Sequence, residues 1–330
     1  MTETVLVTGG TGFVAGWCVA ELLRRGYDVR VTVRSLARKA TVSDAGGRVS
    51  VFVADLTSDV GWDAAVAGCD YVLHVASPLG GGDSTDPDEL IVPARDGALR
   101  VLKAATKAEV KRVVMTSSCA AATPPRDREG GVFDETVWTD VEGARLNAYR
   151  KSKVVSERAA WRFMADNEGP TTLTTVLPGA VFGPVLSADN LGSVRVIGRL
   201  VEGRMPGVPR LGFNIVDVRD LADLHLRAMT SAQAAGQRFI GVGEFMWLND
   251  VAKELRAKLG PAAGKVPTRV LPDFLFRLIS LFDPGVRAVL PNLGRKYLHT
   301  SEKAQRLLAW RPRPAATTVV DCAESLLAAR

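Results

Sequence analysis

The 330-residue sequence predicts an α/β fold, in which a doubly wound parallel sheet is followed by a smaller, mostly helical C-terminal lobe. Three observations lead to this fold class. Residues 4–33 read as a strand, a glycine-rich turn, a helix and a second strand. Short apolar strands then alternate with helical patterns, and beyond residue 182 the pattern becomes less regular. We therefore expect a sheet domain at residues 1–180, with a return segment near 213–240, and a second lobe formed mainly by 181–330.

The first strand is the apolar run Val5-Leu6-Val7, and a glycine-rich turn follows it. Glycine has no Cβ, so the backbone at Gly9 and Gly12 can turn sharply and approach a pyrophosphate closely. A helix from Phe13 to Arg25 comes next, and its first turn offers free N–H groups and the positive end of the helix dipole. Ala15 stands where the third glycine of such turns usually lies. In this strand–turn–helix–strand context, the turn predicts a dinucleotide site.

The second strand, Asp28 to Val33, ends in basic residues instead of an acidic one. Asp or Glu at this place would hydrogen-bond the adenosine ribose of NAD. Arg34 stands there, with Arg38 and Lys39 close behind. A guanidinium binds phosphate with two parallel hydrogen bonds, so these residues favour the 2′-phosphate of NADPH. The alternative interpretation is a solvated loop of basic residues.

The remaining strands and helices follow in alternation. The expected strands are 49–53, 71–75, 112–116, 172–177 and 213–216, and the expected helices are 62–67, 90–108, 147–167, 190–201 and 217–229.

Residues at the carboxyl ends of two of these strands suggest further cofactor contacts. Asp55 follows the third strand, where its carboxylate would meet the adenine amino group. Ala76 and Ser77 follow the fourth strand, and their small side chains let a cofactor lie flat against the sheet. His74 lies inside that strand, so we interpret it as a packed core histidine. A glycine-rich loop from Leu79 begins at the same edge.

Tyr149 and Lys153 are four residues apart at the start of a helix, so they share one helical face. A tyrosine hydroxyl has a pKa near 10. A neighbouring ammonium favours the phenolate, which brings the pKa toward neutral pH and fits the phenol for proton transfer. Ser118 follows the fifth strand. Its hydroxyl can hydrogen-bond the carbonyl oxygen with which the phenol exchanges a proton. The spacing alone occurs by chance on many helices, but here it follows a dinucleotide turn.

Composition and charge narrow the function classes. A hydrophobic content of 47% with 24% charged residues is typical of a soluble globular protein. The net charge of +6 is spread without a Lys/Arg run, so we expect no nucleic-acid partner. No leader or membrane-spanning stretch is expected, and the four scattered cysteines are typical of a reduced, cytoplasmic protein. The three histidines are too scattered to predict a metal site.

The chain resembles the extended short-chain dehydrogenase/reductase superfamily, in the branch of dihydroflavonol reductases, cinnamoyl-CoA reductases and bacterial aldehyde/ketone reductases. The resemblance covers nearly the whole length. It implies a Rossmann domain, NADPH/NADP+ as cofactor, a small-molecule carbonyl substrate and a monomer or homodimer. The motifs that carry it are VTGGTGFVAGW, VTVRS, DLTS, DYVLHVASP, KRVVMTSS, YRKSK and LPGAVFGP.

The resemblance also implies site residues. The catalytic triad would be Ser118, Tyr149 and Lys153, with Tyr149 as the proton donor and Lys153 binding the ribose. Leu79, Ser118, Cys119 and Tyr149 would contact substrate. The implied cofactor residues are Gly9, Thr11, Gly12, Phe13, Val14, Arg34, Arg38, Lys39, Asp55, Leu56, Val75, Ala76, Ser77, Thr116, Tyr149, Lys153, Pro178 and Val181.

Three alternatives to a carbonyl reductase remain open from the sequence. The first is a nucleotide-sugar epimerase or dehydratase on the same fold, which Arg34 disfavours because such enzymes keep NAD. The second is a hydroxysteroid-type dehydrogenase. The third is a nonenzymatic NADP-sensing module, which the retained pair of Tyr149 and Lys153 disfavours.

Overall fold

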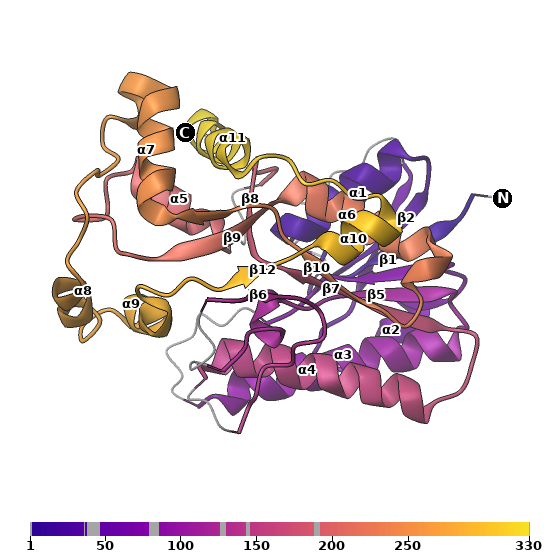
Figure 1. Ribbon diagram of the computed structural model, residues 1–330. Helices are drawn as coiled ribbons and strands as arrows, with labels where there is room; N and C mark the ends of the chain where they lie inside the picture. Colours follow the sequence, from indigo (N-terminus) through magenta and orange to yellow (C-terminus); the bar gives the residue numbers. More distant parts are fainter. Residues whose placement is uncertain are drawn as a thin grey trace.

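The computed structural model of this chain describes residues 2–35, 37, 47–78, 86–125, 130–142, 146–187 and 192–329. Within these residues, seven parallel strands form one sheet with helices on both faces (Figure 1), which confirms the predicted fold class. In spatial order the strands are β10 (Arg238–Gly241), β7 (Thr172–Pro178), β5 (Arg112–Thr116), β4 (Tyr71–His74), β1 (Thr4–Val7), β2 (Asp28–Val33) and β3 (Val49–Val53).

The direction of winding reverses between β1 and β4. From β1 the chain adds β2 and β3 on one side, and it then crosses over to add β4, β5, β7 and β10 on the other. The two strands at the reversal are paired in parallel, with Val7 beside Leu73. In open parallel sheets, ligands bind in the crevice beyond the carboxyl ends of the strands at this point. The reversal therefore places the glycine turn after β1 and residues 75–78 after β4 on the same crevice.

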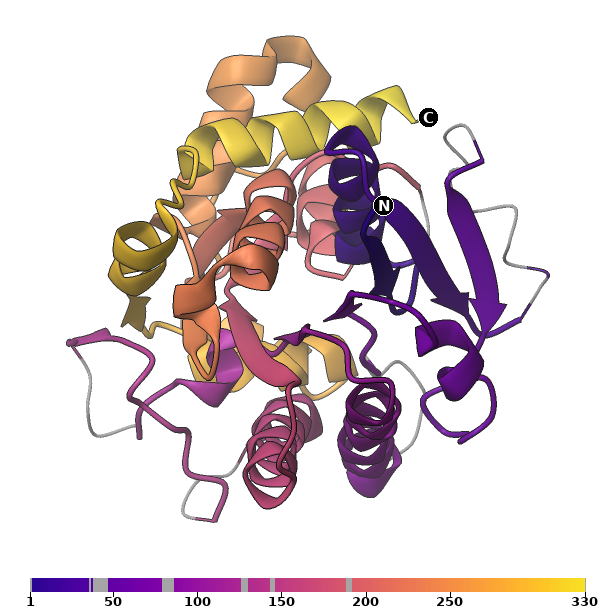
Figure 2. The ribbon, with the colours of Figure 1, turned by 90° about the vertical axis from the view of Figure 1, so that its right-hand side faces the viewer.

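Helices cover both faces of the sheet because each presents an apolar side to it. In Figure 2 one group lies above the sheet and another below it. On one face α1 packs against α6, and buried residues such as Leu22 and Leu224 join the core there. On the other face α3 packs against α4, around residues such as Leu102. The bounds are α1 (Phe13–Arg24), α6 (Val218–Thr230), α2 (Trp62–Val66), α3 (Asp88–Lys107) and α4 (Ala148–Asp166).

A second, smaller group of elements has its own apolar core. The expected strand at 213–216 is present, but it pairs within a separate sheet, and the chain returns to the main sheet at β10. Trp17 of α1 donates a hydrogen bond of 2.9 Å to the carbonyl of Pro184, which fastens this group to the main domain. Its elements are β8 (Ala180–Phe182), β9 (Gly212–Asp217), β11 (Phe245–Trp247), α5 (Val194–Val201), α7 (Leu248–Leu259), α8 (Asp273–Ile279), α9 (Pro284–Val289) and α11 (Ala315–Ala328).

The remaining elements are short. A two-stranded parallel sheet joins the segment after β5 to the segment after α9. Among the described residues, no helix combines the length and the apolar character that a membrane span requires. The short elements are β6 (Val132–Phe133), β12 (Leu298–His299), α10 (Glu302–Leu308), η2 (Cys119–Ala121), η3 (Ala232–Ala234), η4 (Gly260–Ala263) and η5 (Leu290–Asn292).

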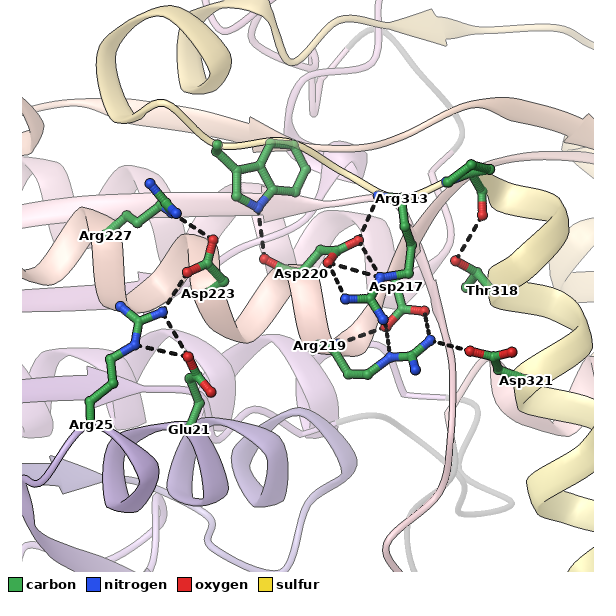
Figure 3. A network of polar contacts seen from close by, with 12 residues as sticks. Glu21, Arg25, Asp217, Arg219, Asp220, Asp223, Arg227, Arg313, Thr318 and Asp321 are labelled. Atoms are coloured by element: carbon green, nitrogen blue, oxygen red, sulfur yellow. Dashed lines mark hydrogen bonds and ion pairs between the residues drawn. The ribbon is translucent and has the colours of Figure 1, made fainter.

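Ion pairs along α6 tie the C-terminal segment to the rest of the molecule (Figure 3). Asp217 is fully buried at the start of α6, where its carboxylate accepts hydrogen bonds from the backbone and the guanidinium of Arg219. The same guanidinium also donates to Asp321 of α11 at 2.6 Å. One turn on, Asp220 accepts bonds from the backbone and side chain of Arg313. These contacts join α11 and the segment before it to α6.

Candidate active site

The turn after β1 is held close to the end of β4. The buried hydroxyl of Thr8 accepts a hydrogen bond of 2.9 Å from the backbone N–H of Ala76 and lies 3.0 Å from Nδ1 of His74. Burial lowers the pKa of His74 to about 3, so the ring is neutral, as expected of a core histidine. These contacts bring Gly9 against Ala76. A Cβ on Gly9 would lie 3.0 Å from the Ala76 Cβ, and Gly9 has a φ of +70°, which favours glycine.

Gly10 is part of this turn, although the sequence did not single it out. A Cβ at Gly10 would lie 2.7 Å from the Cβ of Val31 on β2, which is closer than side chains pack. The neighbouring Thr32 accepts a hydrogen bond of 3.0 Å from the N–H of Gly9 through its hydroxyl, and its carbonyl accepts one from Gly10. The turn is thus fixed by β2 as well as by β4.

The first turn of α1 is open to an anion. Gly12 is the N-cap residue, and its N–H bonds to the Gly9 carbonyl at 2.8 Å. Among the described residues, no side chain caps this helix and no acidic residue lies in its first turn. The backbone N–H groups there and the positive end of the helix dipole suit a pyrophosphate. The Phe13 side chain packs on the core of the smaller group of elements, and Val14 packs on the main core.

Arg34 and Asp55 lie at the adjacent carboxyl ends of β2 and β3. These strands are paired in parallel, with Val33 beside Val53, and Arg34 is exposed. Hydrogen bonds from the hydroxyl and backbone of Thr57 lower the pKa of Asp55, and the charge of Arg34 acts in the same direction. The exposed guanidinium is therefore near the crevice edge where the sequence predicts a 2′-phosphate. Arg38 and Lys39 lie outside the described residues, as does Leu79.

Ser118, Tyr149 and Lys153 come together at the carboxyl end of β5. Tyr149 is in the first turn of α4, whose N-cap Asn147 accepts a hydrogen bond from the backbone of Arg150. A side-chain hydrogen bond joins Tyr149 to Ser118. The Nζ of Lys153 lies 5.8 Å from the centre of the Tyr149 ring and donates a hydrogen bond of 3.0 Å to Oγ of Ser77. One cluster therefore combines a phenol and an ammonium from α4 with a hydroxyl from the end of β5.

The protonation of this cluster differs from the expectation. We expected the ammonium of Lys153 to lower the pKa of Tyr149. Instead, burial raises the pKa of the Tyr149 phenol above its usual value, and the hydrogen bond with Ser118 only partly opposes it. Burial also lowers the pKa of Lys153 to about 8, with the carboxylate of Glu157 acting in the opposite direction. For both groups, the effect of burial on the pKa therefore outweighs the opposing interaction with a neighbouring side chain.

Thr116 has a partner that the sequence did not suggest. The Nδ1 of His225 lies 2.8 Å from the Leu221 carbonyl, so this nitrogen carries the ring hydrogen. Its Nε2 then accepts a hydrogen bond of 2.7 Å from the Thr116 hydroxyl. Burial lowers the pKa of His225 to about 4, which keeps the ring neutral. The Thr116 hydroxyl is therefore engaged with α6, and a cofactor contact at this residue stays a prediction.

The other expected site residues lie around the same end of the sheet. Cys119 is buried, and its thiol donates a hydrogen bond of 3.2 Å to the Leu177 carbonyl. It therefore points into the core, a direction that does not favour its expected substrate contact. Pro178 ends β7 and is buried, whereas Val181 on β8 is partly buried against the main core. Leu56 packs closely on α3 at Gly97.

Comparisons with known proteins agree with this geometry. Residues 5–243 match the model of the NAD dependent epimerase/dehydratase family. Anthocyanidin reductase from Vitis vinifera is 36% identical over 286 residues, which cover 81% of this chain and 83% of that protein. Cinnamoyl-CoA reductase CAD2 from Medicago truncatula is 38% identical over 248 residues, covering 71% and 74%. Among solved structures, yeast methylglyoxal/isovaleraldehyde reductase Gre2 complexed with NADPH is similar, with a TM-score of 0.83 and 28% identity, covering 99% of this chain and 98% of Gre2.

Proposed function

The chain belongs to the NAD dependent epimerase/dehydratase family, within the extended short-chain dehydrogenases/reductases, and from this premise we propose that it is an NADPH-dependent carbonyl reductase. It reduces an aldehyde or ketone to the alcohol, in a reversible reaction. The observation that carries the proposal is the cluster in which Tyr149 is hydrogen-bonded to Ser118 and lies beside Lys153. Two relatives and one structural neighbour are reductases by name, which supports reduction as the direction.

The cofactor is NADPH, and the turn after β1 fits its pyrophosphate. The uncapped first turn of α1 supplies N–H donors, and Gly9 and Gly10 leave no Cβ between the turn and its neighbours. Arg34 suits the 2′-phosphate because its guanidinium is exposed at the end of β2. The residues we propose to bind the pyrophosphate are Gly9, Thr11, Gly12, Phe13 and Val14.

The rest of the cofactor would extend along the carboxyl ends of the strands toward Tyr149. Small residues after β4 leave the path open, and Lys153 already contacts Ser77 there. The proposed contacts are Asp55 and Leu56 for the adenine, Val75, Ala76, Ser77 and Lys153 for the ribose, and Thr116, Pro178 and Val181 near the nicotinamide.

The chemistry needs a proton donor, and the site provides one. The bound cofactor supplies the hydride that the carbonyl carbon accepts. Tyr149 donates the proton to the developing alkoxide, and its raised pKa keeps the phenol protonated at neutral pH. Ser118 holds the carbonyl oxygen beside that phenol. Lys153, with a pKa of about 8, carries its positive charge at pH 7 and stabilises the negative charge that forms on the phenol.

The substrate pocket is proposed to lie between this cluster and residues 181–330. That part of the chain is mostly helical and has a separate apolar core, so its surface over the crevice can vary without disturbing the sheet. We propose an apolar aldehyde or ketone as the substrate class, since a sugar nucleotide would need many polar partners in the pocket. Leu79, Ser118 and Tyr149 remain the proposed substrate contacts. Cys119 was the fourth expected contact, but its buried thiol argues against it.

A screen of NADPH oxidation tests this function. The panel contains aldehydes, diketones, ketoesters, hydroxysteroid-type ketones and sugar nucleotides, and the products are identified by mass spectrometry. We expect NADPH consumption with at least one carbonyl compound, and the corresponding alcohol in equal amount. Conversion of a sugar nucleotide without net NADPH consumption would instead assign epimerase or dehydratase activity. If the protein binds NADPH but converts no compound of the panel, the result would favour a nonenzymatic NADP-sensing module.

A further inference from the structure

Glu157 is a fully buried carboxylate next to the Ser118–Tyr149–Lys153 cluster but not part of it. It lies on α4, one helical turn after Lys153, and its side chain has no exposed surface. Ser117 of the β5 end donates to its Oε2 at 2.7 Å, and Thr175 of β7 donates to its Oε1 at 2.8 Å. Trp161 adds a longer contact of 3.3 Å. Glu157 therefore joins α4 to the strands β5 and β7 from inside the core.

The charge of Glu157 is balanced by Arg238 of β10. The Nε of Arg238 lies 2.8 Å from Oε1 of Glu157, and both side chains are buried. The guanidinium also donates to the backbone carbonyls of Glu135 and Val137, and it lies 3.6 Å from the centre of the Trp138 ring. An ion pair this deep costs desolvation energy, and an apolar pair of similar volume would serve stability as well or better. The pair therefore indicates a role besides stability.

Two features link Glu157 to the reaction. Its partner Ser117 precedes Ser118, so the bond fixes the strand end that carries the Ser118 hydroxyl. Its negative charge also raises the pKa of Lys153, which lies four residues earlier on the same helix. The other groups around Lys153 are the phenol of Tyr149 and the neutral ring of His74 on β4. Glu157 is thus the anion that acts on this ammonium within the described residues.

We propose that Glu157 is a positioning residue for the Ser118–Tyr149–Lys153 site. Its carboxylate holds the end of β5 in register with the first turns of α4, and it places a negative charge one helical turn from the Lys153 ammonium. Without this charge, desolvation would act on Lys153 unopposed and the amine would lose its proton at lower pH. The inference rests on the proposed function, because Lys153 matters only if it contacts the cofactor ribose.

The variant Glu157→Gln tests the charge, since it keeps the shape and most of the hydrogen bonds. NADPH affinity is measured by cofactor fluorescence from pH 6 to 9.5 without carbonyl substrate, and kcat/KM is measured over the same range. In the wild type we expect both to fall above about pH 8, where Lys153 loses its proton. In Glu157→Gln the fall should begin on the order of one pH unit lower, with near-normal binding at pH 6.

Further variants separate charge from position and from folding. Glu157→Gln combined with Arg238→Gln removes both buried charges and so avoids an unpaired guanidinium. It should shift the alkaline loss of NADPH affinity in the same direction as Glu157→Gln, toward lower pH. Ser117→Ala keeps the charges but releases the strand end, so kcat should drop several-fold with no shift along the pH axis. The matched control is Glu135→Gln, which removes another buried carboxylate, one that accepts a bond from the Ile240 backbone. In Glu135→Gln, NADPH affinity and kcat/KM should fall at the same pH as in the wild type.

Specific results would overturn the proposal. If NADPH affinity in a folded Glu157→Gln or double variant falls at the same pH as in the wild type, the Glu157 charge does not influence Lys153. An unchanged kcat in Ser117→Ala would show that the Ser117–Glu157 hydrogen bond does not position Ser118. This test holds even if both Glu157 variants fail to fold. A wild type that binds NADPH but reduces no carbonyl compound would overturn the proposed function instead, because the binding profile is measured without substrate.

Discussion

The ammonium of Lys153 donates a hydrogen bond of 3.0 Å to the hydroxyl of Ser77, which joins the catalytic helix α4 to the end of β4. Ser77 lies directly after Ala76, whose backbone is bonded to Thr8 at the start of the glycine turn. The proposed proton-transfer site and the proposed pyrophosphate site are thus connected through two successive residues after β4, Ser77 and Ala76. The contact fixes where the amine can meet a ribose hydroxyl.

Replacing Ser77 by alanine should weaken this arrangement. The Ser77 hydroxyl is an acceptor for a buried cation, and a hydrogen bond of this kind contributes about 1–2 kcal/mol. We expect kcat/KM for NADPH to fall roughly five- to thirtyfold in Ser77→Ala, which is the same free energy expressed as a rate ratio. Ser77→Thr, which keeps the hydroxyl, is the control and should retain most activity. Equal kinetics for Ser77→Ala and wild type would show that the contact does not orient Lys153.

Arg34 should determine the preference for NADPH over NADH. In Arg34→Asp, a phosphate ligand becomes a carboxylate that repels the 2′-phosphate and suits the ribose of NAD. NADPH affinity should fall on the order of a hundredfold, whereas NADH affinity should change less than about threefold. Dissociation constants from cofactor fluorescence measure both. Arg162→Asp, an exposed arginine on α4, changes the net charge equally and should affect neither. Equal losses for both cofactors in Arg34→Asp would mean that Arg34 does not contact the 2′-phosphate.

The buried Asp217 should contribute to stability through the ion pairs of Figure 3. Asp217→Asn keeps the shape but removes the charge that Arg219 and Arg313 face. We expect the free energy of unfolding to fall by about 2 kcal/mol, because the buried side chain of Asp217 loses charge-assisted hydrogen bonds from Arg219. Denaturant unfolding at pH 7 measures the change. Asp166→Asn, which removes a surface pair of 3.7 Å, should change stability by less than about 0.5 kcal/mol. Similar small effects in both variants would contradict a stabilising role for Asp217.

The parts of the fold that depend on local pattern could be predicted from sequence. The strand–turn–helix–strand unit, the strand ends at Arg34 and Asp55 and the shared face of Tyr149 and Lys153 all follow from short-range spacing. The structure confirms the parallel sheet. It also places Ser118 beside Tyr149 as the resemblance implied.

Features that depend on distant segments could not be predicted. Gly10 is required by the approach of Val31 on the next strand, and nothing in the turn itself signals that approach. Arg238 lies 81 residues from its partner Glu157, on a strand of four residues whose sequence carries no strong strand signal. The pKa of Tyr149 was expected to fall because a cation is near, but the extent of burial, which reverses the direction, is a property of the assembled site.

Transfer of deuterium from NADPH labelled at the transferable position of nicotinamide C4 tests the central claim most directly. With a carbonyl substrate from the screen, we expect one deuterium on the carbinol carbon of the product, detected by mass spectrometry. The single-turnover rate should fall at least about a hundredfold in Tyr149→Phe, with NADPH binding nearly unchanged, and should be unaffected in the control Tyr71→Phe. Full-rate transfer in Tyr149→Phe, or an alcohol product without deuterium, would contradict the account.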